Sequence, residues 1–450
     1  MARGFRAAAG ASVLIASIWM LWEPLPPGGA SAFSQEEAVV DTLPADAPYL
    51  ERLRAATTIL PDDEIRALWV VRDALTTPES INRLIDFAVQ TRTHLLFVQV
   101  RGRGDVFYRS SIDPPASVLV APLADFDPLA YLIELAGRQG ISVHAWLNVF
   151  LIWSSPTETP PPSHIMATHP EWLLTDARGR RMDRVPRSQW KKLGIEGYFV
   201  SPSVPAMRRH MARVVRELVT SYPVDGVHLD YIRYPGREFA YDPVSRSEFA
   251  VRWGVDPAEL VHGDRKALQG ALGASGLALV DSLSSAQRRL DVDSMVVAIR
   301  GACEGRALSA AVVADPAIAS MEKWQNWEKW VNQGWMDFVV PMAYNFPPLE
   351  LEHRAQVYQR MVGRDRVLIG LGVFDGREEY LAEAVELLRG VGVAGYALFS
   401  YNALAEGRYG VALIEDAVLP PDTSGVDEDD GGDDENGDEV APEDDDSDEE

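Results

Sequence analysis

Residues 224–235, VDGVHLDYIRYP, have the pattern of a short buried strand that ends in a carboxylate. Because side chains alternate along a strand, Gly226, His228 and Asp230 lie on one face and the apolar residues between them on the other. The apolar face is expected to pack on helices, so the polar face points into a sheet or barrel interior. Asp230 then stands at the C-terminal end of the strand, where parallel α/β folds place their sites. The alternative is that Asp230 only caps the following turn.

Strand and helix patterns alternate on both sides of this stretch. Seven further strands are predicted, at 65–71, 95–101, 142–148, 308–315, 337–344, 367–373 and 395–401. Helices are predicted between them, at 78–90, 127–139, 205–222, 293–300, 324–333 and 379–389. This alternation implies a parallel sheet, and eight strands over about 340 residues predict an α/β fold of the (β/α)8 TIM-barrel type. Long strand-to-helix loop insertions are expected at 150–200 and 235–290.

The N-terminal part of the chain differs from the rest. The chain has 450 residues, of which 47% are hydrophobic, so it can bury a large core. Arg3 and Arg6 precede an apolar run, and a small-x-small pattern follows it at 30–32. Residues 1–32 are therefore predicted to be a secretory signal peptide, which places the mature protein in the periplasm or outside the cell, with an uncleaved membrane anchor as the alternative. A polar, unpatterned surface arm is expected over 33–61, before a barrel domain over 62–418.

The C-terminal end is strongly acidic. From residue 421 on there are 17 Asp and Glu and no Lys or Arg, so the rest of the chain carries −8 of the formal net charge of −25. Such a self-repelling segment cannot bury enough apolar surface to fold, and residues 419–450 are predicted to be a disordered tail, with weak calcium capture as the alternative. Cys303 is the only cysteine, so no intramolecular disulfide forms.

Polar and aromatic side chains gather at the C-terminal ends of the predicted strands. They are, in chain order, Arg101, Arg103, Asp105, Trp146, Asn148, His228, Asp230, Arg233, Asp315, Tyr344, Asn345 and Tyr401. Strand ends of a parallel barrel meet at one face, so these residues predict a polar cleft there. Two local alternatives remain: residues 101–105 form an anion-binding turn, and His228 is a hydrogen-bonded core group.

Such a cleft suits carbohydrate, because aromatic faces stack on sugar rings while polar groups bind the hydroxyls. Glycoside hydrolysis needs two carboxyl groups, about 5 to 9.5 Å apart, one of which protonates the leaving oxygen. Asp230 is one candidate, and Asp105 and Asp315 compete for the other role. The remaining residues of the set are predicted to bind substrate. No histidine pair has the spacing of metal ligands, so neither a metal nor a cofactor is expected.

Five stretches occur in an order that resembles a known family. They are QVRGRGDVFYRSSIDP (99–114), DPLAYLIELAGRQGISVHAWLN (127–148), HPEWLL (169–174), VDGVHLDYIRYP (224–235) and GWMDFVVPMAYN (334–345). Over about residues 64–405 the chain resembles the bacterial glycosyl-hydrolase-like family ten, secreted TIM-barrel proteins related to a peptidoglycan glycan hydrolase of enteric bacteria. The resemblance implies hydrolysis of a polysaccharide, and in some members of peptidoglycan strands stripped of peptides.

The family's motif residues can be carried over by position. Asp230 matches its strand-four Asp, Tyr344 its strand-six Tyr, and Arg101, Arg103 and Asp105 its strand-two motif. The sequence departs from the family at GYFVSPSVP (197–205) and at Ile232 and Arg233, which replace aromatic residues and alter the expected subsites. Ile232 also stands where the chitinase pattern DGxDxDxE has its acid, so a chitinase mechanism at this strand is not expected.

Two functions follow from these patterns. The first is an extracytoplasmic glycoside hydrolase that acts on a polysaccharide or cell-wall glycan through two carboxylates. The second is a carbohydrate-binding barrel without hydrolysis, which keeps the cleft but needs no carboxylate pair. No nucleic-acid partner is expected, and the sequence leaves the sugar, the stereochemistry and the oligomeric state open.

Overall fold

The computed structural model describes residues 47–56, 64–119, 126–155, 157–263, 265–344, 346–373 and 378–406. The predicted signal peptide (1–32) and acidic tail (419–450) lie outside the described residues. Within the described ranges, no helix is long and apolar enough to cross a membrane.

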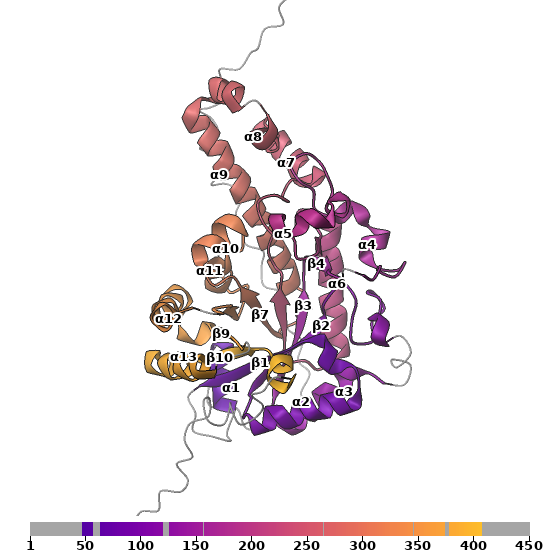
Figure 1. The fold of residues 1–450 in the computed structure, drawn as a ribbon, viewed down its shortest axis with the longest axis vertical. Coiled ribbons are helices and arrows are strands. Elements are labelled where there is room, and N and C mark those ends of the chain that lie inside the picture. The colour runs from indigo at the N-terminus through magenta and orange to yellow at the C-terminus, as the bar shows by residue number, and fades with distance from the viewer. Residues whose placement is uncertain are drawn as a thin grey trace, which may run out of the picture. The chain divides into compact units, whose positions relative to one another are not determined.

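In the described chain, eight parallel strands stand side by side in sequence order (Figure 1). They are β1 (Ile65–Val70), β2 (Leu95–Arg101), β3 (Ser142–Asn148), β6 (Gly226–Asp230), β7 (Ala307–Val312), β8 (Phe338–Pro341), β9 (Ile369–Gly372) and β10 (Gly395–Phe399). β1 pairs with both β2 and β10, so the first and last strands are neighbours. Parallel bridges from Val339 to Val367 and from Met342 to Gly370 connect β8 to the β9 segment and nearly close the ring. The predicted TIM barrel is confirmed.

The predicted strand boundaries differ from the observed ones mainly at the C-terminal ends. β2 and β3 have the predicted limits, whereas β7 ends at Val312 and β8 at Pro341. The chain leaves the sheet at these points, so Asp315 and Tyr344 belong to the loops above their strands.

Helices follow the strands and cover the outside of the barrel (Figure 1). They are α2 (Pro78–Gln90), α3 (Pro128–Arg138), α6 (Pro205–Ser221), α9 (Arg265–Arg300), α10 (Pro316–Glu322), α11 (Trp327–Asn332), α12 (Pro348–Val362), α13 (Glu378–Val391) and α14 (Tyr401–Glu406). Local sequence explains their starts. In α2, for example, Thr77 and Ser80 form a reciprocal capping box around Pro78, and the apolar residues of one face are buried.

Both predicted insertions have structure of their own. The first contains β4 (Leu151–Trp153), α4 (Ile165–Thr168), α5 (Trp190–Leu193) and β5 (Tyr198–Phe199), and β4 pairs with β5 in an antiparallel sense. The second contains α7 (Pro243–Trp253), α8 (Glu259–His262) and the first part of α9, on which α7 and α8 pack. Helical geometry in α9 is interrupted at Gly273, which has φ of 71°.

Part of the segment predicted to be a surface arm forms a helix that packs on the barrel. Residues 49–56 form α1 (Tyr49–Ala56), whose Leu50 is fully buried and belongs to the same apolar cluster as the barrel interior. Tyr49 stacks on Phe338 of β8, with ring centroids 5.7 Å apart. The helix thus has one side on the barrel and one in solvent, since Leu50 and Leu53 are buried whereas Arg52, Ala55 and Ala56 are exposed. The short apolar pattern of α1 was missed because it lies between polar, Pro-containing stretches.

The barrel interior is filled by apolar and neutral polar side chains. His228 lies there fully buried, accepts the indole N–H of Trp69 at 3.0 Å and stacks on Phe97 at 4.0 Å. His228 and His144 both contact the hydroxyl of Ser309, at 2.9 and 3.1 Å. Burial lowers the pKa of both histidines, so the interior holds them neutral.

Candidate active site

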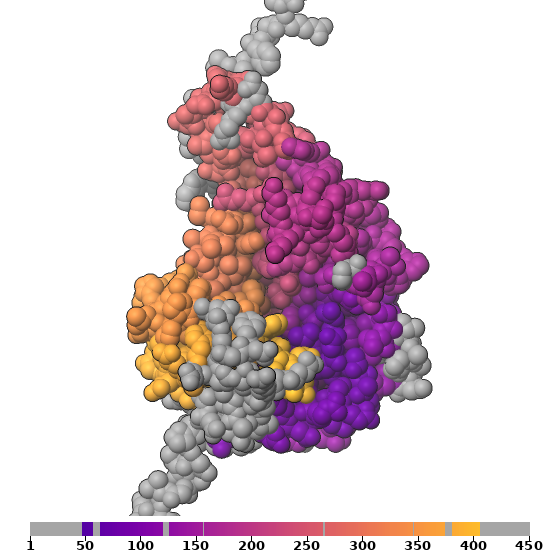
Figure 2. Space-filling view, viewed as in Figure 1, coloured from indigo at the N-terminus to yellow at the C-terminus, as the bar shows by residue number. Residues whose placement is uncertain are grey.

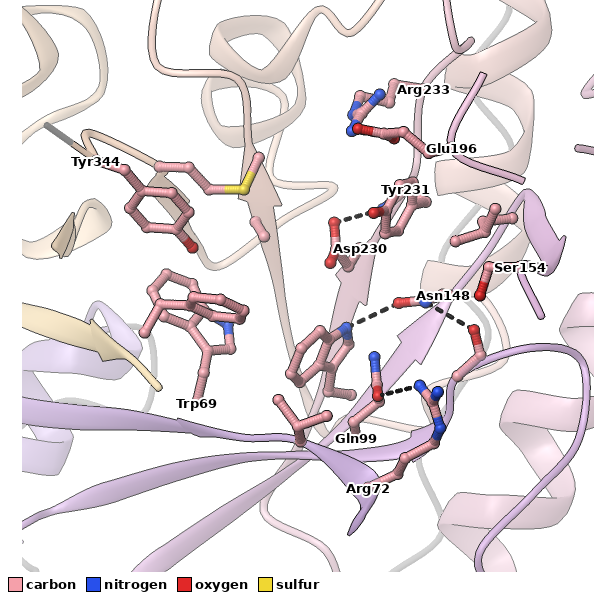
Figure 3. Close-up of a pocket in the computed structure, with 17 residues that line it drawn as sticks. Trp69, Arg72, Gln99, Asn148, Ser154, Glu196, Asp230, Tyr231, Arg233 and Tyr344 are labelled. Carbon is pink, nitrogen blue, oxygen red and sulfur yellow. Dashed lines mark hydrogen bonds and ion pairs between the residues drawn. The ribbon is translucent and has the colours of Figure 1, made fainter. Parts of the chain in front are cut away.

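A pocket of about 380 Å³ opens at the C-terminal ends of the barrel strands (Figure 3). Its lining comes from β1, β2, β3, β6, β7, β8 and β10, or the loops after them, and from the first insertion. The lining residues are Trp69, Val71, Arg72, Gln99, Gly102, Trp146, Asn148, Leu151, Ser154, Glu196, Asp230, Tyr231, Arg233, Ala311, Met342, Tyr344 and Phe399. Five of them were predicted from the sequence, namely Trp146, Asn148, Asp230, Arg233 and Tyr344.

Asp230 is the last residue of β6, paired in register with Asn148 of β3. Its carboxylate accepts the backbone N–H of Tyr231, with Oδ1 2.6 Å from the nitrogen. Tyr231 has φ of 49°, a left-handed conformation that is uncommon outside glycine and occurs preferentially at functional sites. The capping contact offered as the alternative is thus present, and Asp230 also lines the pocket.

Burial raises the pKa of Asp230 from 3.8 to about 6. Loss of water around the carboxylate is the largest cause, since only 9% of the residue is exposed. The charge of Arg233 and the N–H of Tyr231 oppose this rise, and the charge of Glu196 adds to it. A carboxyl group with a pKa near 6 keeps its proton in mildly acidic solution, so it can protonate a leaving group.

Glu196 is the second carboxylate in the pocket lining, and the sequence analysis missed it. Its side chain is 51% exposed and accepts a hydrogen bond from Arg233 at 3.4 Å. Figure 3 shows this pair on the Asp230 side of the pocket. Glu196 belongs to the first insertion, just before β5, where Gly197 leaves no room for a Cβ beside Trp153 of β4. A Glu-Gly pair before a short strand is a weak signal, because it shows no periodic pattern.

A hydrogen-bonded chain fixes the wall beside Asp230, which is formed by the neighbouring strand β3, by β2 and by the loops after β1 and β2. Trp146 donates its indole N–H to Asn148 at 3.0 Å, and Asn148 donates in turn to the carbonyl of Gly102 at 2.7 Å. Arg72 donates to Gln99 at 2.9 Å. A Cβ at Gly102 would lie 2.8 Å from the Arg72 guanidinium, so glycine lets the loop after β2 approach this pair. These contacts hold polar groups in place without a ligand.

Aromatic rings form the wall that faces Asp230. Tyr344 meets Trp69 edge to face at 6.2 Å and stacks on Phe399 at 5.5 Å. Burial raises the pKa of Tyr344 well above its usual range, so its hydroxyl remains a hydrogen-bond donor. Ring faces beside a few fixed polar groups are typical of sites that bind small polar molecules such as sugars.

The structure does not bring Asp105 into this pocket. Asp105 lies in the lining of a separate cavity, against Arg103, whose backbone N–H donates to it at 3.2 Å. Arg103 itself pairs with Glu158 at 2.8 Å and lies over the ring of Trp153. Asp105 and Arg103 are therefore corrected from pocket residues to neighbours of the pocket. The loop after β2 folds back on β2 through a bridge between Val106 and Arg101, and this turn directs the side chains of Arg103 and Asp105 away from the pocket.

Asp315 is also not among the residues that line the pocket. It caps α10 by accepting the N–H groups of Ala317 and Ile318, at 2.9 and 3.0 Å, and it forms an ion pair with Arg354 at 3.1 Å. These N–H donors, the largest cause, lower the pKa of Asp315. An Asp-Pro pair before a helix is a capping signal, and this structural role explains the residue fully.

Three other predicted site residues lie outside the pocket lining. Arg101 is fully buried, pairs with Asp113 at 2.7 Å and donates to the carbonyl of Asn148 at 2.6 Å, so it holds a residue of the pocket in place. His228 is the hydrogen-bonded core group described above, as the alternative interpretation of the sequence predicted. Tyr401 packs on Phe87 of α2, with centroids 5.4 Å apart. Asn345 lies outside the described residues.

In the part of the chain that the structure describes, no group of three or more His, Cys, Asp or Glu side chains is placed to hold a metal ion.

Residues 64–366 match the model of the family described as glycosyl hydrolase-like 10. Glycosyl hydrolase YngK of Bacillus subtilis is 24% identical over 222 residues, which cover 45% of this chain and 39% of that protein. Glycosyl hydrolase DigH of Escherichia coli K12 is 21% identical over 285 residues, covering 58% and 56%. The chain thus spans about half the length of these relatives, or less.

Two solved structures are similar in fold. α-L-Fucosidase isoenzyme 2 of Paenibacillus thiaminolyticus has a TM-score of 0.51 at 15% identity, covering 75% of this chain and 46% of that one. The catalytic domain of β-amylase from Paenibacillus polymyxa has a TM-score of 0.50 at 10% identity, covering 76% and 94%. At these identities the likeness concerns the barrel alone.

Proposed function

Since the chain belongs to the glycosyl hydrolase-like 10 family, we propose that it is a glycoside hydrolase that cleaves O-glycosidic bonds of a polysaccharide in the barrel pocket. The observation that carries the proposal is that Asp230 and Glu196 line one pocket, which aromatic rings wall on the other side. Two carboxyl groups beside a ring-lined cavity are what hydrolysis of a glycoside requires.

The two carboxyl groups have different surroundings and so different roles. Asp230 is buried with a raised pKa, and it donates its proton to the glycosidic oxygen as the bond from that oxygen to the anomeric carbon breaks. Glu196 is half exposed and held by Arg233. Its carboxylate either attacks the anomeric carbon as a nucleophile or acts as a general base that activates a water molecule for this attack. Water finally supplies the hydroxyl group of the new reducing end, and its remaining proton replaces the one that Asp230 donated.

The substrate class follows from the family and from the expected location of the protein. A family resemblance to enzymes that act on peptidoglycan strands stripped of peptides makes such denuded glycan the first substrate to test. Export rests on the N-terminal pattern at 1–32, and mass spectrometry of the native N-terminus checks it. A protein that keeps Met1 in the cytoplasm would contradict export.

The test compares hydrolysis by the full chain and matched variants on denuded peptidoglycan glycan, chitin and alginate-type polymer. Glu196→Gln is expected to lower kcat by about a hundredfold or more, because it removes one of two carboxylates that act in the transition state. Glu158→Gln is the control, since Glu158 is also 51% exposed and also pairs with an arginine, but in the neighbouring cavity.

Three outcomes decide between the alternatives. Loss of activity in Glu196→Gln but not in Glu158→Gln supports the assignment. Equal activity in all three proteins shows that Glu196 is not the partner of Asp230. Saturable binding of a glycan without release of new reducing ends would instead establish the carbohydrate-binding barrel.

A further inference from the structure

A second cavity of about 540 Å³ lies among the elements of the second insertion. It shares no lining residue with the barrel pocket. Arg288 of α9 lines it and is only 7% exposed. The Arg288 guanidinium lies 4.8 Å from the ring centroids of both Tyr241 and Trp324, and its Nε donates to the carbonyl of Ala240 at 3.3 Å. Among the described residues, no carboxylate is within ion-pair distance of Arg288.

A buried cation without an opposing charge is unusual. Charged side chains that leave water are normally paired, because the lost hydration is otherwise uncompensated. Two aromatic faces and one carbonyl offset only part of this loss. The indole N–H of Trp324, which is 1% exposed, also has no acceptor in the described structure. The lining of the cavity therefore includes a cation without an ion-pair partner among the described residues and one buried indole N–H without an acceptor.

The surroundings extend this excess of positive charge. An adjoining cavity of about 610 Å³ shares Arg237, Tyr241 and Val261 with the first, and Arg178 and Lys192 of the first insertion line its far side. Together the two cavities are lined by six Lys and Arg but only three Asp and Glu, in a chain whose formal net charge is −25. Figure 2 shows the magenta segment of the first insertion against the salmon segment of the second, from which this cationic groove is built.

We propose that the cationic groove, residues 176–193, 237–262 and 281–324 where they line these cavities, binds an acidic polysaccharide through its oxyanion groups. Arg288, which the two rings hold in place, binds one carboxylate or phosphate of the polysaccharide, and the neighbouring arginines and lysine bind further acidic groups along it. The rings of Tyr241 and Trp324 are almost fully buried and hold the Arg288 guanidinium in place, and the choice of a glycan as ligand rests on the function proposed for the neighbouring barrel pocket. Trp324 also packs against Tyr234 at 5.1 Å, one residue after Arg233 of the barrel pocket, so the two sites are neighbours.

The experiment measures binding by calorimetry on the full chain, and hydrolysis is not needed for it. The probes are tetragalacturonate, sodium tripolyphosphate and the uncharged chitotetraose. Tetragalacturonate binding is expected to weaken about tenfold in Arg237→Gln and to vanish in Arg288→Gln. High salt is expected to weaken binding to the wild type as well, because it screens the charges. Arg213→Gln is the matched control, because Arg213 is an exposed arginine of α6 that lines neither cavity.

Each result has a defined meaning. Binding of tetragalacturonate alone identifies a sugar acid, and binding of tripolyphosphate as well identifies a phosphate-bearing glycan as a second source. Should Arg288→Gln fail to fold, the pair Arg237→Gln and Arg289→Gln decides instead. The proposal is overturned if wild type binds neither probe, if these variants bind like Arg213→Gln, or if a DNA oligonucleotide binds more tightly than tetragalacturonate. Asp230→Asn should bind as wild type does, which separates this site from the proposed hydrolysis.

Discussion

Replacing Asp230 by asparagine is expected to abolish hydrolysis and to stabilise the protein at neutral and alkaline pH. Asparagine keeps the size of the side chain and an oxygen that accepts the N–H of Tyr231, but it carries no charge. In the wild type, burial raises the pKa from 3.8 to about 6, so ionisation of the carboxyl group disfavours the folded state. At about 1.4 kcal/mol per pKa unit, this difference corresponds to about 3 kcal/mol.

The pH dependence of this effect has a definite sign. The folded state holds the proton of Asp230 more tightly than the unfolded chain does, so the wild type loses free energy of unfolding as the pH rises from about 4 to about 6. Above that range the loss is complete. The variant has no such proton, and its melting temperature should exceed that of the wild type at pH 8 by about 4 °C, given an unfolding entropy of roughly 2 cal/mol/K per residue over about 340 residues.

Thermal unfolding of both proteins between pH 4 and pH 8, together with hydrolysis assays, checks this reasoning. Asp225→Asn is the control for activity, because Asp225 lies just before β6 at the opposite end of the barrel, where it accepts the N–H of Val143 at 2.8 Å. Its turnover should stay near that of the wild type. A variant at Asp230 that still hydrolyses glycan, or that is no more stable than wild type at pH 8, would refute the assignment of Asp230 as a buried acid.

Two further predictions concern the neighbours of Asp230 and the base of the barrel. Arg233→Gln should move the alkaline limb of the pH–activity profile upward, on the order of one pH unit, because the charge of Arg233 lowers the pKa of Asp230; an unchanged or lowered limb would contradict this. Leu50→Ala should cost about 2 to 5 kcal/mol of unfolding free energy in denaturant titrations, because it empties a fully buried position under the barrel, whereas the exposed Arg52→Ala should change it by less than about 0.5 kcal/mol. Equal effects of the two substitutions would show that α1 does not close the barrel.

The fold was predictable because its signals are local and repeated. Each barrel strand is a short apolar run bounded by turn residues, and eight of them alternate with helices, so an error at one boundary changes little. The ends of β7 and β8 were placed too late because apolar residues continue into the loops above the strands. α1 was missed for the opposite reason, since only the barrel it packs on gives its few apolar residues a role.

The candidate site was predictable only where a side chain continues the alternation of a strand. Trp146, Asn148 and Asp230 follow that rule, and all three line the pocket. Loops do not follow it, so nearness to strand ends predicts Asp105 and Asp315 as candidates for the second carboxylate, although neither lines the pocket. Glu196 is brought to the pocket by the pairing of β4 with β5, two segments about 45 residues apart whose contact no local pattern reveals.

The chemistry expected of Asp230 depends on the packing beneath it as much as on the pocket above. His228 lies two residues before Asp230 on the interior face of β6, and burial keeps it neutral, stacked on Phe97 and bonded to Trp69. A protonated histidine at this place would favour the carboxylate and lower its pKa. Because burial keeps His228 and His144 neutral, the charge of Arg233 is the largest influence that opposes the effect of burial on Asp230, and the pKa of Asp230 is about 6. In the proposed mechanism, this neutral barrel core keeps the carboxyl group of Asp230 protonated for its role as the acid.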